Sequence, residues 1–103
     1  MNHITITGNV VNKELTYTTA EDPLAICKIR VATDKPHGRE GTIFFNVKAF
    51  RRTAENCDTY LHKGSKVAVA GYMNIEEYEK DGQKKLWPEI VAEEVEFLDR
   101  IER

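Results

Sequence analysis

The sequence lacks the features that would place the chain in a membrane or around a metal. It has no run of about 18 apolar residues, and no basic stretch followed by an apolar one at the N-terminus. Cys27 and Cys57 lie far apart and belong to no Cys-x-x-Cys or Cys/His cluster, so neither a zinc site nor a required disulfide is expected. These absences predict a cytoplasmic protein without membrane contact, metal or cofactor, whose two cysteines serve as apolar core residues.

Patterns typical of catalysis are also missing. His3, His37 and His62 are widely spaced along the chain. No nucleophile with a neighbouring base, no pair of carboxylates on a rigid frame and no Gly-rich phosphate loop is recognisable. We therefore expect a protein that is not an enzyme.

Apolar and aromatic residues are present in the proportion that a folded domain needs. The chain has 103 residues, of which 41% are hydrophobic, and we interpret 1–103 as a single domain. Its net charge of -2 argues against a polyanionic ligand. Residues 89–103 hold six acidic and two basic residues, however, which leaves 1–88 with thirteen basic and eleven acidic ones. We expect the acidic end to lie away from a basic groove.

Alternation of apolar and polar residues predicts an all-β fold. Five segments alternate in this way, over residues 3–11, 24–33, 42–50, 66–78 and 86–98. Asp22-Pro23 and Asp81-Gly82 mark turns, Gly71 a sharp bend, and Pro88 an edge or a bulge. Residues 52–62 have helical spacing instead, and Gly64 is interpreted as the stop signal of that helix.

Three strands, one short helix and a long two-stranded hairpin are the element order of the oligonucleotide/oligosaccharide-binding (OB) barrel. This fold is a five-stranded, partly open Greek-key barrel. An SH3-like barrel would give a similar series of strands, but without the helix.

The strand over residues 42–50 carries the residues most suggestive of function. Its polar face presents Phe44, Lys48 and Phe50, and Arg51 and Arg52 follow at once. Rings that alternate with cations suit a groove for single-stranded nucleic acid, because rings stack on bases and cations follow the phosphates. The alternative is that the two rings pack in a second small core or a subunit interface.

The hairpin offers further candidates for stacking. Tyr78 shares a face with Tyr72 and lies near the tip, where lysines partly offset the acidic residues that would repel phosphate. These lysines are Lys80, Lys84 and Lys85, and the acidic residues are Glu76, Glu77 and Glu79. Trp87 either stacks on a base as well or belongs to the core or to an interface. A charged, solvated hairpin without a ligand is the alternative for the whole element.

Nearly the entire chain resembles the bacterial and phage single-stranded-DNA-binding protein family. The stretches that carry the resemblance are Met1-Asn2-x-Ile4-x-Ile6-x-Gly8-Asn9, residues 14–18 (ELTYT), 31–33 (VAT), 44–56 (FFNVKAFRRTAEN) and 60–65 (YLHKGS), Tyr78-x-x-Asp81-Gly82-Gln83 and Glu94-x-x-Phe97-Leu98. The resemblance implies an OB barrel that forms a homotetramer, with the first strands pairing across a dimer. It also implies non-specific binding of single-stranded DNA during replication, recombination or repair, in the company of replication or recombination proteins.

The resemblance also places roles on individual residues. Phe44, Phe50 and Tyr78 match base-stacking positions of the family, and Arg52 and Lys63 match positions that contact phosphate. With the candidates above, the expected DNA-binding set is Phe44, Lys48, Phe50, Arg51, Arg52, Lys63, Tyr78, Lys80 and Lys84.

Several positions depart from the family pattern. Thr16 stands where the family usually has Arg, and His37 lies roughly where many members have Trp. Asn74, Glu76 and Glu77 replace much of a polar-to-basic stretch. Each exchange removes a cation or a ring, so we expect weaker DNA binding than in a typical member. The given sequence ends at Arg103 and does not include the flexible linker and acidic tip by which members of the family it resembles recruit partner enzymes. Either the tail was never there, as in short phage, plasmid or paralogous members, or the given sequence stops before it.

A second interpretation keeps the fold and changes the partner. The acidic hairpin residues 76–79 favour a protein adaptor with weak nucleic-acid binding, comparable to primosomal replication proteins that share the fold. A dimer with weak oligonucleotide binding would support the adaptor, and a tetramer with tight binding would support the DNA-coating protein.

Overall fold

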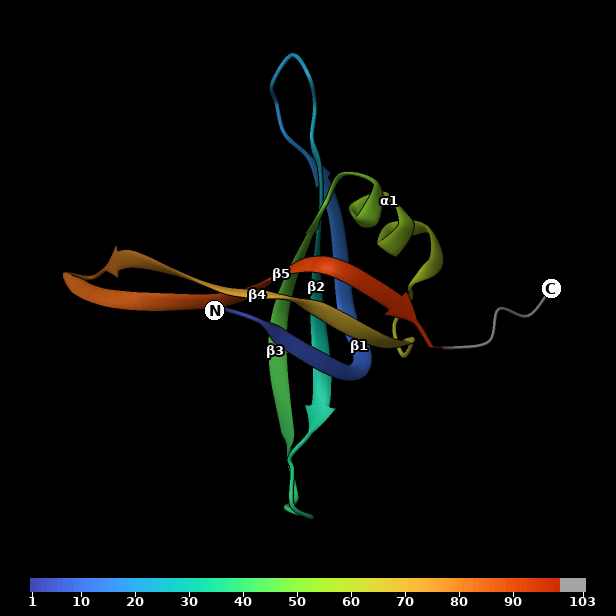
Figure 1. The fold of residues 1–103 in the computed structure, drawn as a ribbon. Coiled ribbons are helices and arrows are strands. Elements are labelled where there is room, and N and C mark those ends of the chain that lie inside the picture. Colours follow the sequence, from blue (N-terminus) through green and yellow to red (C-terminus); the bar gives the residue numbers. More distant parts are fainter. Residues whose placement is uncertain (99–103) are drawn as a thin grey trace.

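The computed structural model describes residues 1–98 and contains one closed barrel of five strands (Figure 1). The elements in chain order are β1 (Ile4–Tyr17), β2 (Ala25–Asp34), β3 (Thr42–Phe50), α1 (Arg51–Tyr60), β4 (Lys66–Lys80) and β5 (Gln83–Phe97). Around the barrel the order is β1-β2-β3-β5-β4, and only the contact between β3 and β5 is parallel. The strand number and the helix between β3 and β4 confirm the predicted fold class.

Alternate side chains of the five strands fill the barrel interior. To these α1 adds Ala54 and Cys57, and Leu61 follows directly after the helix. The buried set includes Val10, Cys27, Ile29, Val31, Val47, Ala49, Ala54, Cys57, Leu61, Val67, Val69 and Ile90. Both cysteines are free thiols. Burial raises the pKa of Cys57 to about 12, with a smaller effect from neighbouring Cys27, whose own pKa is also raised mainly by burial.

β1 is longer than predicted, because it serves two neighbours in turn. Residues 4–9 pair with β4, and residues 9–17 pair with β2, with a register irregularity between Val10 and Asn12. The polar sequence after Val11 suggested an end to the strand. In the fold, the Lys13 ammonium donates to the main-chain carbonyl of Asp58 in α1 and also pairs with that residue's carboxylate at 3.6 Å. The second half of β1 is thereby anchored to the helix.

The end of α1 also differs from the prediction. The helix ends at Tyr60, and Leu61 has extended backbone angles and a buried side chain. Gly64 is therefore not the helix stop. Its φ of 94° places it in the turn that follows, where its N–H donates to the Val10 carbonyl at 2.7 Å.

β4 and β5 continue beyond the barrel as a hairpin arm, which we define as residues 75–88. Every residue of the arm is exposed, and Figure 1 shows it projecting away from the barrel. Asp81 and Gly82, with φ of 54° and 75°, form the predicted two-residue turn. Pro88 pairs only with β4, so it occupies an edge, as expected.

Two features lie where the arm leaves the barrel. A register irregularity falls between Ala70 and Gly71, and a Cβ on Gly71 would stand 1.9 Å from the Val91 carbonyl oxygen. Only glycine allows this close approach of β4 to β5. The Asn2 side chain makes two hydrogen bonds with the main chain of Met73, donating to its carbonyl at 2.7 Å and accepting from its N–H at 3.0 Å.

Within residues 1–98, no helix is long and apolar enough to cross a membrane.

Candidate nucleic-acid interface

The outer face of β1, β2 and β3 carries the predicted rings and a row of cations. The register places Phe44 opposite Ala32, Lys48 opposite Lys28 and Phe50 opposite Ile26. The Phe44 side chain is 49% exposed, whereas Phe50 is half-buried. Phe44 therefore belongs to no second core within this chain, and both rings lie on the side of β3 that faces away from the barrel interior.

Arg30 is a cation of this face that sequence reasoning did not select. Its guanidinium carbon lies 4.4 Å from the centroid of the Phe44 ring, within the range of a cation–π contact. Alternation along β2 puts Arg30 and Lys28 on the same outer face, opposite to the buried Ile29. Their proximity to β3 depends on strand register, which no local pattern reveals.

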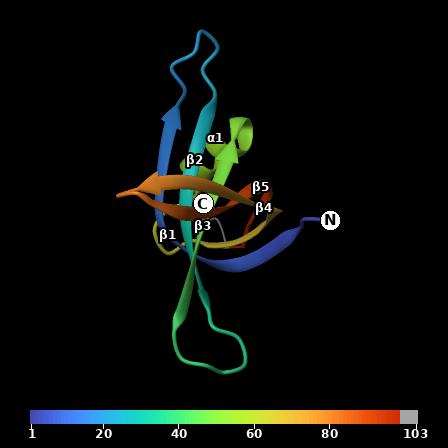
Figure 2. The same cartoon turned by 90° about the vertical axis from the view of Figure 1, so that its left-hand side faces the viewer.

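A groove of about 310 Å³ lies between this face and the base of the hairpin arm. In Figure 2 the arm lies in front of β1, β2 and β3. The groove has basic residues Lys28 and Arg30 on one wall, Asn46 on β3, and Trp87 and Glu89 on β5. The Trp87 side chain is 47% exposed, which places it outside the core.

Glu89 is the polar centre of the groove. It is only 6% exposed, and its Oε1 lies 3.1 Å from the Lys48 ammonium. Its Oε2 accepts a long hydrogen bond, 3.5 Å, from the indole N–H of Trp87. The charge of Lys48, a predicted phosphate contact, is therefore already balanced within the chain.

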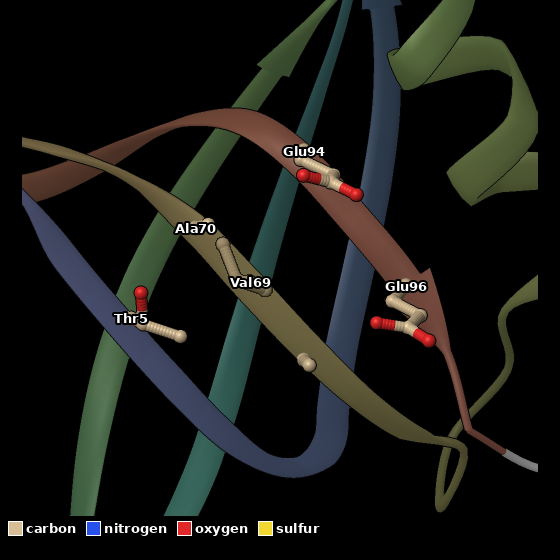
Figure 3. A pocket seen from close by; sticks show the side chains of 6 residues that line it. Thr5, Val69, Ala70, Glu94 and Glu96 are labelled. Atoms are coloured by element: carbon tan, nitrogen blue, oxygen red, sulfur yellow. The ribbon is translucent and has the colours of Figure 1, made fainter.

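The expected separation of the acidic end from the basic groove is wrong for Glu89. β5 pairs with β3 at this point, and Glu89 lies on the outer face, opposite to the buried Ile90, where it meets Lys48. Glu94 and Glu96 instead lie elsewhere, beside Thr5, Ala68 and Ala70 of β1 and β4 (Figure 3). Glu93 is exposed on β5, and the other charged residues of the acidic end, Asp99, Arg100, Glu102 and Arg103, lie outside the described residues.

The arm turns one face toward the groove, and Tyr78 belongs to that face. The register pairs Glu76 with Trp87 and Tyr78 with Lys85, so these four residues share a face with Glu89. The Tyr78 side chain is 42% exposed. Lys80 is also on this face.

The other face of the arm carries a different set of side chains. Lys84 lies there, opposite Glu79, together with Glu77 and the exposed apolar residues Ile75 and Leu86. Alternation along the arm thus separates Lys84 from Tyr78 and leaves Lys85 as the cation across from the ring.

The other predicted cations lie around α1. Arg51 and Arg52 are exposed at its start, directly after Phe50. Lys63 is exposed beyond the C-terminal end of α1. The ten-residue helix separates the two arginines from Lys63 by about 15 Å along the helix axis. Within residues 1–98, no group of three or more His, Cys, Asp or Glu side chains is arranged to hold a metal ion.

Comparison with known proteins gives one consistent result. The model of the Single-strand binding protein family matches residues 1–98. The single-stranded DNA-binding protein of Thermotoga maritima is 36% identical over 96% of this chain and 74% of its own length. That of Wolinella succinogenes is 35% identical over 95% of this chain. Single-stranded DNA-binding protein 3 of Listeria innocua is 33% identical over 96% of it. The match spans 64% of the length of each of the last two relatives.

Proposed function

Because the chain belongs to the single-strand binding protein family, we propose that it binds single-stranded DNA without sequence specificity and without altering it chemically. Unpaired bases stack on Phe44, Phe50 and Tyr78, and basic side chains contact the phosphates. The observation that carries this proposal is the outer face of β3, where exposed or half-buried rings stand beside the cations of β2.

The predicted cations differ in how far they lie from the rings and in whether a carboxylate already binds them. Arg51 and Arg52 are exposed and adjoin Phe50, while Lys80 shares the face of Tyr78. Lys63 and Lys84 lie farther from the rings, at the end of α1 and on the other face of the arm. Lys48 must leave Glu89 to contact DNA. Because acidic side chains balance part of the positive charge, the proposed binding is weaker than in a typical family member.

We extend the proposal to assembly and to cellular role. Residues 4–8 of β1 pair with β4 along one edge, and the pairing with β2 begins only at Asn9. The other edge of residues 4–8 is suited to pairing with a second copy of the chain, since an open strand edge is a template for pairing. A homotetramer built from such dimers would coat single strands in the bacterial cytoplasm during replication, recombination or repair, together with replication or recombination proteins.

Titration of labelled oligo-dT and of a duplex of equal length tests the DNA-binding proposal. Fluorescence anisotropy at several salt concentrations should show tighter binding of the single strand. The plot of log affinity against log salt should fall by roughly 0.7 for each phosphate contact. Equal binding of both DNAs, or single-strand binding that ignores salt, would contradict the proposal. Light scattering gives the oligomeric state.

A second candidate function is that of a protein adaptor. The face of the arm that carries Ile75 and Leu86 exposes these two large apolar side chains beside the acidic residue Glu77, which pairs with Leu86. Such a surface suits a protein partner better than a polyanion, because the carboxylate repels phosphate. A dimer that binds oligonucleotides only weakly would favour this function.

A further inference from the structure

We propose that Trp87 and the groove beside it form a further subsite, which takes one unpaired nucleotide with its base against the indole ring. The inference rests on the proposed DNA-binding function and deepens it. It adds a fourth ring to Phe44, Phe50 and Tyr78, at the root of the hairpin arm rather than on the sheet or near the arm's tip.

The indole ring of Trp87 is exposed to solvent, and a hydrogen bond to Glu89 fixes its orientation. Nearly half of the Trp87 side chain is exposed, although Trp is the largest apolar side chain available to a core. Its N–H points to the buried carboxylate of Glu89, which is itself held by Lys48. A ring anchored along one edge loses little conformational freedom when a base stacks on it, so the contact is preorganised.

The groove has the size and chemistry for one nucleotide. Its volume of about 310 Å³ lies at the lower end of small-ligand sites. Ile29 and Val47 contribute apolar lining, and the Asn46 amide offers a donor and an acceptor to a base edge. Lys28 and Arg30 supply positive charge for the phosphate of the same nucleotide.

Acidic residues in the groove favour a base over a dense phosphate backbone. Glu14 lies opposite Lys28 in the β1–β2 register, and Glu89 is paired with Lys48. Carboxylates at these positions repel a duplex, in which two phosphate backbones lie close together. They tolerate an unpaired base, because its edge carries N–H groups, either an amino group or the ring N–H of thymine, from which a carboxylate can accept a hydrogen bond.

The position of the subsite connects the two sets of rings. Asn46 lies midway along β3 between Phe44 and Phe50, so the groove opens between the two sheet rings. On the arm, Trp87 and Tyr78 are diagonal neighbours on one face, which places their Cα atoms roughly 7–8 Å apart. A single strand that follows the sheet can therefore continue onto the arm through Trp87 without losing stacking.

Trp87 is the sole tryptophan of the chain, which makes its fluorescence a direct probe of the subsite. The experiment titrates the protein with unlabelled oligo-dT while following tryptophan emission, in parallel with anisotropy of a labelled oligo-dT. The matched variants are Trp87→Leu and Leu86→Ala, because Leu86 is the exposed neighbour on the opposite face of the arm. Circular dichroism confirms that each variant is folded.

The proposal expects saturable quenching of the indole at the DNA concentrations where anisotropy rises. Trp87→Leu should bind about 5- to 100-fold more weakly, the range expected for one lost stacking contact, and Leu86→Ala should match the parent. Anisotropy that reports binding while Trp87 emission stays constant would overturn the subsite and leave the DNA-binding function intact. Quenching without an affinity loss in Trp87→Leu would also overturn it. Absence of any anisotropy change in the parent protein would reject the DNA-binding function itself.

Discussion

β4 and β5 contribute to two regions of the molecule. Their barrel parts form a section of the barrel wall, and residues 75–88 form the exposed arm. In the barrel, Val69 and Ile90 are buried, whereas in the arm Ile75 and Leu86 are exposed although they are equally apolar. The register is continuous from Gly71 into the arm, so pairing does not distinguish the two regions. What differs is whether other strands and α1 cover a face. A paired strand therefore stabilises the fold only where other elements pack on one of its faces.

The largest expected effect is at Gly71, where barrel and arm meet. Gly71→Ala should lower the free energy of unfolding by about 3 kcal/mol or more, because the new methyl group collides with the Val91 carbonyl. Urea unfolding followed by circular dichroism measures it. The control is Gly82→Ala in the arm turn, where nothing lies within 4 Å and only the positive φ penalises alanine, by about 1 kcal/mol. Equal losses for both variants would mean that the arm is as important to stability as the barrel.

The next largest effect is on DNA affinity. It should follow from a change in the arm that leaves the free energy of unfolding nearly unchanged. Tyr78→Ala should weaken oligo-dT binding by about 1 to 3 kcal/mol through the loss of one stacking surface. Its free energy of unfolding should stay within about 0.5 kcal/mol of the parent, as for other exposed positions. Tyr78→Phe retains the ring and should bind almost normally. An unchanged affinity in the alanine variant would remove Tyr78 from the interface.

A pH titration probes the dry interior of the barrel. The pKa of the Cys57 thiol is raised from 9.0 to about 12 in the fold, so above pH 9 the unfolded chain releases a proton that the folded chain keeps. Stability is therefore complete below pH 9 and falls as pH rises toward 12, by about 1.4 kcal/mol per pH unit for this thiol. Urea titrations at pH 8 and pH 10 should show a smaller fall in Cys57→Ala. Equal falls in both proteins would show that the thiol contributes nothing to the pH dependence.

The smallest effect is expected at Glu89, on the border of the arm. Glu89→Gln releases Lys48 for phosphate while an amide oxygen still accepts the indole hydrogen bond. Oligo-dT affinity should rise by roughly 0.5 kcal/mol, in the range of a single partly solvated ion pair, and the salt slope should steepen by roughly 0.7. Glu77→Gln makes the same charge change on the far face of the arm. If both variants gain equally, the effect is one of net charge and not of Lys48.

Alternation was sufficient to predict most of the barrel, because each strand buries one face. It identified the inward side of β2 and β3 and the turn at Asp81-Gly82. It does not extend β1 past Val11, because β1 changes its partner from β4 to β2 at Asn9 and the residues themselves do not signal this change. Local patterns describe a strand well, but they do not tell which strand lies beside it.

The same limit applies to the interface. Phe44 and Tyr78 were predicted as exposed rings, and they are exposed. The groove is not predicted, because its lining residues come from β1, β2, β3 and β5, which are far apart in the sequence. For Trp87 the sequence allows stacking on a base, the core or an interface, and only the register of the arm assigns it to the face that carries Glu89.

The contact between Arg30 and Phe44 has a consequence for the heat of binding. In the free protein the guanidinium already occupies the surface of the ring, at 4.4 Å from its centroid. A base that stacks there replaces a cation instead of covering bare hydrocarbon, and the released Arg30 can move to the phosphate of the incoming nucleotide. Binding at this position is thus an exchange of partners, so its calorimetric enthalpy should be smaller than that of a stacking contact formed on an unoccupied ring.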